Sequence, residues 1–211
     1  MPDTILEILT LGRFSISVDG KPVATDWPDE TIKVFFCSLL SPLDLSFTWD
    51  RICRSMWGEP ATRTSRRRLE EIFIRPLNSF LLKELGFNPL IAGPEGIRIK
   101  QQGIYVDALE FYSTVVEGLR LLSLGNHAAA LEKFSRANSL YAGCYLPGMP
   151  GKIIANTRND LESMYRTAVV NGIRQARSTL CPNNTELSGT DTHGSVKVHS
   201  PVNTKSKSTR D

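Results

Sequence analysis

The sequence of 211 residues lacks the features of membrane-spanning and secreted proteins. No apolar run approaches the roughly 20 residues that a membrane-spanning helix needs. The first residues, Met1 to Thr4, show neither the basic nor the apolar segment of a signal peptide. Only four cysteines are present, far apart and without a Cys-x-x-Cys pair: Cys37, Cys53, Cys144 and Cys181. We therefore expect a cytoplasmic protein with free, reduced thiols and no membrane contact.

Catalytic and cofactor-binding motifs are also missing. The sequence contains no Gly-x-Gly-x-x-Gly, no phosphate-binding loop, no His-Glu-x-x-His and no Gly-x-Ser-x-Gly. The three histidines, His127, His193 and His199, are isolated and form no metal-ligand pattern with the cysteines. We therefore expect a protein that is not an enzyme and that binds neither a cofactor nor a metal ion.

A strong excess of one charge is absent as well. The formal net charge is only +3, and residues 1–110 carry 13 basic and 15 acidic side chains. Residues 111–177 carry 8 basic and 4 acidic side chains, and residues 178–211 carry 4 and 3. The N-terminal half is therefore slightly acidic, so we expect its non-specific binding to nucleic acid to be weak and steeply salt-dependent.

The N-terminal part begins with a strand pattern. Residues 5–18 alternate between apolar and polar side chains from Phe14 onward, and Asp19-Gly20 provides a two-residue turn before Lys21-Pro22-Val23. This pattern predicts a β-hairpin. A second hairpin is predicted at residues 90–99, where two short strand-like runs flank a turn of Gly, Pro and Glu.

Three helices are predicted between these two hairpins. Apolar side chains recur at helical spacing in residues 31–40 and 49–57, and a proline follows each segment within three residues. The third helix is predicted over residues 64–85, basic at its start and apolar later. Pro76 lies inside this segment and is expected to kink the helix.

The C-terminal part is predicted to be helical from residue 107 to 177, with a break at 143–151. Small and bulky residues match one TPR unit of about 34 residues, at Gly118, Leu121, Gly125, Ala130, Phe134 and Ala137. A single unit cannot bury its apolar face alone, so it must pack on the helix that follows, on the N-terminal part or on another subunit. Residues 181–211 are rich in Ser, Thr, Asn and Lys and are predicted to be a disordered tail.

Several short motifs in this order resemble a known family. They are Leu11-Gly12-Arg13-Phe14, Met56-Trp57-Gly58, Gly96-Ile97-Arg98-Ile99 and Val106-Asp107-Ala108-Leu109-Glu110-Phe111. Together they resemble the OmpR-like winged-helix domain of the SARP-type regulators. Residues 112–177 resemble the bacterial transcriptional activator domain that follows in that family, at Tyr141-Ala142-Gly143, Leu146, Arg158, Leu161 and Tyr165.

The resemblance implies a fold and a domain organisation. The expected fold is an α+β N-terminal winged helix with β-hairpins, followed by an all-α TPR-like helical domain. The winged-helix domain would span residues 1–106, the activator domain residues 107–180 and the disordered tail residues 181–211. Members of the family usually carry a longer activator domain, so the chain is expected to dimerise or to pack this domain on its own first domain.

The resemblance also implies a DNA-binding transcriptional regulator, an activator, that needs no cofactor. In this family the third helix enters the major groove, the segment before it faces RNA polymerase, and the 90–100 hairpin is a wing on phosphates or the minor groove. Double-stranded DNA, RNA polymerase and a second copy of the chain are thus candidate partners. The residues assigned to DNA are Arg63, Ser65, Arg66, Arg67, Arg75, Arg98 and Lys100.

The basic segment from Arg63 to Arg68 has a second interpretation. Most runs of charge are solvated helix faces, and here Leu77-Asn78 replaces the Leu-Arg of family members. The chain would then be a protein-interaction adaptor that kept the fold but lost DNA recognition. An exposed face shared by the arginines and Arg98 would favour DNA binding, whereas Glu70 and Glu71 on that face would favour the adaptor. The aromatic residues nearby are expected to pack in the core: Trp49, Trp57, Phe35 and Phe36.

Overall fold

A computed structural model of the protein describes residues 5–23, 26–41, 43, 46–100 and 102–180. The chain divides into two units, Met1–Cys181 and Pro182–Asp211, and all the described residues belong to the first. The predicted disordered tail, residues 181–211, lies outside the described residues. None of the helices in the described ranges combines the length and the apolar character needed to cross a membrane.

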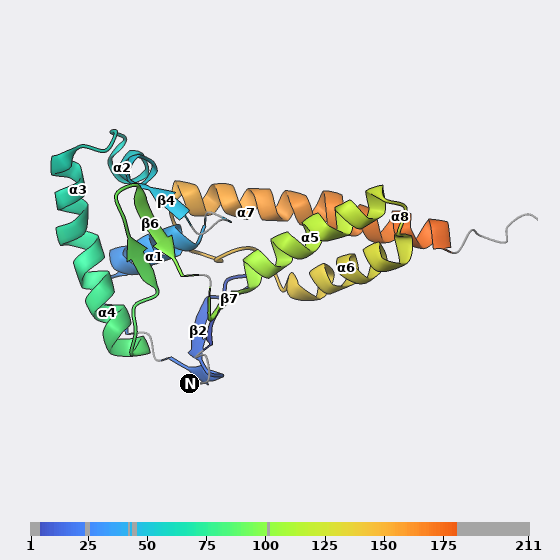
Figure 1. The fold of residues 1–211 in the computed structure, drawn as a ribbon, viewed down its shortest axis with the longest axis horizontal. Helices are drawn as coiled ribbons and strands as arrows, with labels where there is room; N and C mark the ends of the chain where they lie inside the picture. The colour runs from blue at the N-terminus through green and yellow to red at the C-terminus, as the bar shows by residue number, and fades with distance from the viewer. Residues whose placement is uncertain (1–4, 24–25, 42, 44–45, 101, 181–211) are drawn as a thin grey trace, which may run out of the picture. The chain divides into compact units, whose positions relative to one another are not determined.

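Strands are concentrated in the N-terminal part and helices in the C-terminal part, so the fold is α+β, as predicted (Figure 1). A four-stranded sheet has the order β3-β2-β1-β7. Its strands are β1 (Leu6–Leu9), β2 (Ser15–Val18), β3 (Lys21–Pro22) and β7 (Ile104–Val106). β1 runs antiparallel to β2 and parallel to β7. β2 and β3 form the predicted hairpin, in which both turn residues, Asp19 and Gly20, have positive φ.

A second sheet of three antiparallel strands contains the other predicted hairpin. Its order is β4-β6-β5, with β4 at Ser46–Thr48, β5 at Leu90–Ala92 and β6 at Gly96–Ile99. β4 has only three residues, too few to show a periodic pattern in the sequence. It lies very close to β6, because a Cβ at Gly96 would be 2.2 Å from the carbonyl oxygen of Phe47.

The first two predicted helices are confirmed as α1 (Glu30–Leu40) and α2 (Trp49–Trp57). α1 begins after Asp29, whose carboxylate accepts the backbone N–H of Thr31. α2 begins after Thr48 and ends at Gly58, a C-cap with left-handed backbone conformation. The predicted core residues Phe35 and Phe36 are both 1% exposed, so α1 lies in the centre of the N-terminal core.

The third predicted helix is one helical run made of three pieces. These are α3 (Arg63–Leu69), a π-helical segment η1 (Glu70–Ile74) and α4 (Arg75–Leu85). Pro76 has no N–H, so it cannot donate to the carbonyl four residues earlier as an α-helix requires. In the turn directly before it, the N–H of Arg75 donates to the carbonyl of Glu70, which is the i→i−5 bond of a π-helix. A π-helical turn therefore directly precedes Pro76, and the kink expected at the proline stays a prediction.

The C-terminal part consists of helices that pack along one another (Figure 1). They are α5 (Asp107–Ser123), α6 (His127–Leu140), α7 (Lys152–Met164), η2 (Tyr165–Val169) and α8 (Val170–Leu180). The buried ring of Phe134 on α6 lies between Gly118 on α5 and Gly172 on α8. A Cβ at either glycine would lie less than 3.0 Å from this ring. Small residues are therefore needed where these three helices approach one another.

A buried polar junction joins the first strand to the start of α5. The Asp107 carboxylate accepts the backbone N–H of Thr10 at 2.7 Å, the hydroxyl of Thr10 at 2.6 Å and the backbone N–H of Leu11 at 2.9 Å. Asp107 and Thr10 are both buried, so these hydrogen bonds satisfy groups that water cannot reach. The predicted domain boundary between residues 106 and 107 therefore lies next to Asp107, whose carboxylate bonds to the two residues that follow β1.

The segment between α6 and α7 completes this junction. Tyr145 is fully buried, and its hydroxyl shares a 3.3 Å hydrogen bond with the hydroxyl of Ser41 at the end of α1. The backbone N–H of Leu146 donates to the carbonyl of Thr10, and the Arg158 guanidinium donates to the carbonyls of Tyr145 and Leu146. The segment is therefore bonded to both the N-terminal core and α7.

The cysteines of the described residues are free thiols, as predicted. Cys37 and Cys53 are buried, and Cys144 is exposed. Burial raises the pKa of the Cys37 thiol to about 12, so this group stays protonated at neutral pH. Cys181 lies outside the described residues.

Candidate nucleic-acid interface

The start of α3 is fixed by a capping box. The Thr62 side chain accepts the backbone N–H of Ser65 at 3.0 Å, and the Ser65 hydroxyl accepts the backbone N–H of Thr62 at 2.7 Å. Ser65 is half-buried and also lies 3.7 Å from the Cys53 sulfur. The Ser65 hydroxyl therefore caps the N-terminus of α3. A contact of Ser65 with DNA stays a prediction.

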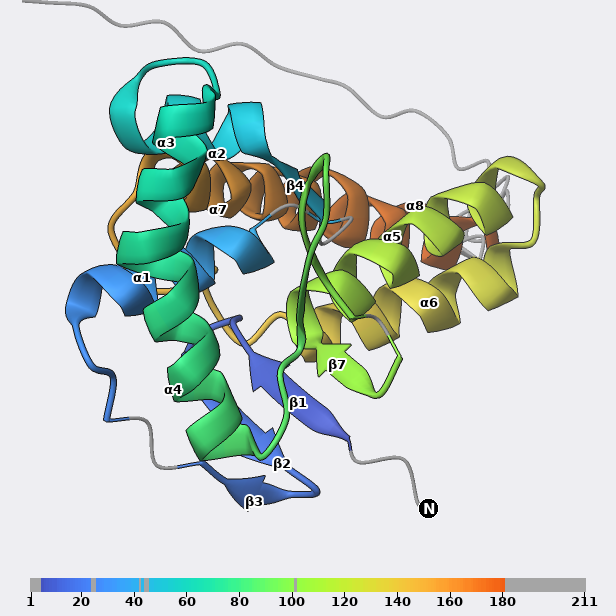
Figure 2. The same cartoon turned by 60° about the vertical axis from the view of Figure 1, so that its left-hand side comes forward.

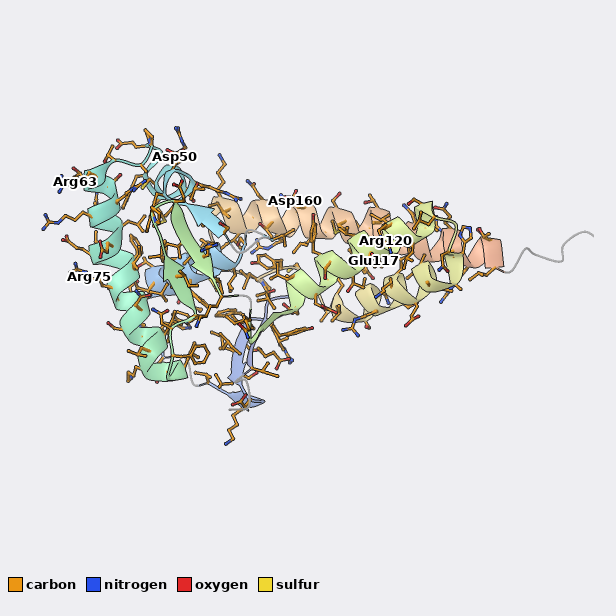
Figure 3. The ribbon with its side chains drawn as sticks, in the orientation of Figure 1. Asp50, Arg63, Arg75, Glu117, Arg120 and Asp160 are labelled. Carbon is orange, nitrogen blue, oxygen red and sulfur yellow. The ribbon has the colours of Figure 1, made fainter. Side chains whose placement is uncertain are left out.

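The arginines that follow this cap are exposed. Arg63, Arg66 and Arg67 all lie on the surface, and Figure 3 shows Arg63 and Arg75 pointing outward from the helical run. Arg63 takes part in no ion pair within the described ranges. A guanidinium in this state is available to a phosphate or to a base edge.

Two of the predicted arginines have acidic partners. Arg67 pairs with Glu71 at 2.9 Å, and Arg75 lies 3.8 Å from Glu70. The hydrogen bond that Arg67 donates to the Glu71 carboxylate raises the pKa of Arg67, which is charged at all ordinary pH values. The helix surface therefore carries both signs of charge, and these acidic side chains would have to exchange for phosphates if DNA bound here.

Three arginines around α2 and α3 lie over aromatic rings. The Arg66 guanidinium is 5.7 Å from the centre of the Trp49 ring, and Arg68 is 5.1 Å from that of Trp57. Arg51 on α2 lies 5.0 Å from the centre of the Phe47 ring. These cation–π contacts restrict where the charged groups can lie without removing their capacity to donate hydrogen bonds.

The hairpin contributes the remaining predicted residues. Arg98 on β6 is exposed because Ile97 and Ile99, on the other face of the strand, are buried in the core. Arg98 helps to line a cavity of about 390 Å³ with Ser46, Phe47, Thr48 and the turn Gly93-Pro94-Glu95-Gly96. Lys100, which follows β6, is also exposed but borders a separate cavity near Gly86 and Gly103. The two hairpin residues therefore do not share one cavity.

The turn of the hairpin and the start of α3 are connected through Trp49. Its indole N–H donates to the carbonyl of Gly93 at 3.0 Å, and its ring lies under Arg66. In both Figure 1 and Figure 2 the hairpin runs alongside the helical run of α3 and α4. Trp49 packs in the core as predicted, at 9% exposure. Its connecting role was missed because Gly93 is 44 residues away in sequence.

Comparisons with known proteins support the fold. No protein-family model matches the sequence, and no curated protein matches it. Among solved structures, Mycobacterium tuberculosis EmbR in complex with a low-affinity phosphopeptide is similar, with a TM-score of 0.53 and 19% sequence identity. The match covers 83% of this chain and 44% of the EmbR chain. This chain is therefore similar in fold to less than half of EmbR.

Proposed function

We propose that the chain is a DNA-binding transcriptional regulator, an activator that acts in the cytoplasm. In this proposal the N-terminal part is a winged helix: α3 enters the major groove, and the hairpin of β5 and β6 is the wing. The observation that carries the proposal is the exposed set of arginines at the start of α3, of which Arg66 is connected to the hairpin turn through Trp49. The EmbR-like fold and the family resemblance of the sequence support it.

The helical part has a different role in this proposal. Helices α5 to α8 form a TPR-like activator domain that contacts a second copy of the chain or the transcription machinery. The loop before α3 would face RNA polymerase when α3 lies in the groove. Because α5 and α7 are bonded to the N-terminal core, a partner bound to the helical part would be held at a constant position relative to the DNA.

Fluorescence anisotropy tests the proposal. We would titrate the full chain into labelled duplex DNA from upstream of its own gene at about 50 mM and about 200 mM salt. The test variant is Arg63→Ala/Arg67→Ala. We expect wild-type binding to weaken steeply with salt, and the variant to lose on the order of tenfold or more in affinity with a smaller salt slope.

A matched control separates DNA contact from general charge loss. Arg166 on η2 is exposed and pairs with Glu162 four residues earlier, just as Arg67 pairs with Glu71 four residues later. An Arg166→Ala/Arg174→Ala variant therefore removes the same charge from the helical part. An equal loss of binding in both double variants would show that the charge of the whole chain, and not α3, attracts the DNA.

The ion pairs of the helical run favour one other function. Glu70 and Glu71 are exposed beside Arg75 and Arg67, so this surface also fits a protein partner. In that case the chain is an interaction adaptor with the fold of a regulator. A folded wild-type protein that binds no duplex at low salt would favour the adaptor over the regulator.

A further inference from the structure

Trp49 touches both parts of the proposed DNA surface. Its ring lies under the Arg66 guanidinium of α3, and its indole N–H donates to the Gly93 carbonyl in the hairpin turn. The side chain is 9% exposed, so packing holds the ring in a single place. One side chain thus contacts an arginine of the helix and the backbone of the hairpin.

The backbone of residue 49 makes a second connection to the same turn. The N–H of Trp49 donates to the carbonyl of Glu95 at 3.1 Å. The turn itself is closed by a 2.8 Å hydrogen bond from the N–H of Gly93 to the carbonyl of Gly96. Trp49 therefore donates two hydrogen bonds to the hairpin turn, one from its indole to Gly93 and one from its backbone to Glu95.

We propose that Trp49 is a positioning residue for DNA recognition, which sets the separation between α3 and the hairpin and orients Arg66. This inference rests on the proposed function. A helix in one groove and a wing on the neighbouring backbone can bind together only if their separation matches the DNA. A guanidinium already restrained by a ring also loses less conformational freedom when it binds a phosphate or base.

Two substitutions separate the two contacts of Trp49. Trp49→Phe keeps a ring under Arg66 but removes the N–H that bonds to Gly93, whereas Trp49→Leu removes both. For Trp49→Phe we expect hydrogen exchange of the Gly93 amide to rise on the order of 2- to 10-fold, because one hydrogen bond on the turn is lost. We expect its affinity for duplex DNA to fall on the order of 3-fold.

A double-mutant cycle shows whether Trp49 acts through Arg66. We expect Trp49→Leu to bind DNA about 2- to 5-fold more weakly than Trp49→Phe, and this extra loss to vanish when Arg66→Ala is already present. Trp57→Phe is the matched control, because Trp57 lies under Arg68 and makes no hydrogen bond to the hairpin among the described residues. This control should change DNA affinity by less than about twofold.

Each outcome bears on a separate claim. Wild-type exchange and wild-type DNA affinity in Trp49→Phe would overturn the positioning role and leave the proposed function intact. If the extra loss of Trp49→Leu over Trp49→Phe persists on the Arg66→Ala background, the claim that Trp49 orients Arg66 is overturned, because the ring then does not act through that guanidinium. If the wild-type protein binds no DNA, the proposed function fails, and the role of Trp49 in recognition fails with it.

Discussion

Polar side chains serve opposite purposes at the junction and on the surface of α3. At the junction, Asp107 and Thr10 are buried, and their hydrogen bonds join residues that are 97 positions apart in sequence. On α3 the charged groups are exposed, and the pair Arg67 and Glu71 is separated by only four positions. The buried groups are saturated by partners within the protein, whereas the exposed groups can exchange partners at small cost. Polar contacts that stabilise this fold are therefore distinguishable from those available to a ligand.

The largest expected effect is at the junction. Asp107→Ala leaves the N–H and hydroxyl of Thr10 and the N–H of Leu11 buried without their acceptor. We expect the free energy of unfolding to fall by about 3 to 5 kcal/mol, which denaturant titration followed by circular dichroism measures. The control is Asp160→Ala on the exposed face of α7, labelled in Figure 3, with a change within about 0.5 kcal/mol. An equal loss of stability in the two variants would contradict the difference between buried and exposed polar side chains.

A smaller effect is expected from two tyrosine hydroxyls. Tyr145→Phe removes a fully buried hydroxyl that bonds to Ser41, and Tyr165→Phe removes one that bonds to Asn138 on the surface. We expect Tyr145→Phe to lose about 1 kcal/mol of stability. The buried Ser41 hydroxyl then loses its hydrogen bond with Tyr145 and keeps, among the described residues, only the one that it donates to the carbonyl of Cys37. Tyr165→Phe should cost less than about 0.5 kcal/mol, because water can take the place of the lost hydroxyl beside the exposed Asn138 side chain. The denaturation midpoints of the two variants measure this difference. A larger loss of stability in Tyr165→Phe than in Tyr145→Phe would show that burial of the hydroxyl does not decide the cost.

The elements of the fold were predictable because their signals are local. Turn residues such as Asp19-Gly20, the helical spacing of α1 and the glycine that ends α2 all act within a few residues of one another. The π turn before Pro76 was not predictable, because a proline signals that an α-helical hydrogen bond is lost but not which bonds the preceding turn makes.

The contacts between elements could not be predicted in the same way. The motif that begins at Val106 contains Asp107, but nothing local indicates that this carboxylate bonds to Thr10. The bond from Trp49 to Gly93 was equally hidden, because tryptophan in an amphipathic helix is ordinarily a packing residue. For the candidate site, the sequence located the basic segment and named Glu70 and Glu71 as its possible neighbours, while their pairing with Arg75 and Arg67 came from the structure.

The smallest expected change in stability accompanies a change in binding. Glu71→Gln replaces the charged partner of Arg67 by a neutral amide and so removes one negative charge from the surface that we propose for DNA. The ion pair is exposed and screened by solvent, so its loss should leave the denaturation midpoint almost unchanged. Arg67 then no longer has to exchange a carboxylate for a phosphate, so we expect DNA affinity to rise on the order of 2- to 5-fold at low salt.

The comparison with Glu162→Gln decides where this gain originates. Glu162 pairs with Arg166 on the helical part, so its substitution makes the same change of charge away from α3. We expect anisotropy at about 50 mM salt to show the gain for Glu71→Gln alone, and the gain to shrink at about 200 mM because salt screens exposed charges. Tighter binding in both variants would show an effect of net charge only. Weaker binding in Glu71→Gln would mean that Glu71 itself contacts the partner, as on the surface of a protein-interaction adaptor.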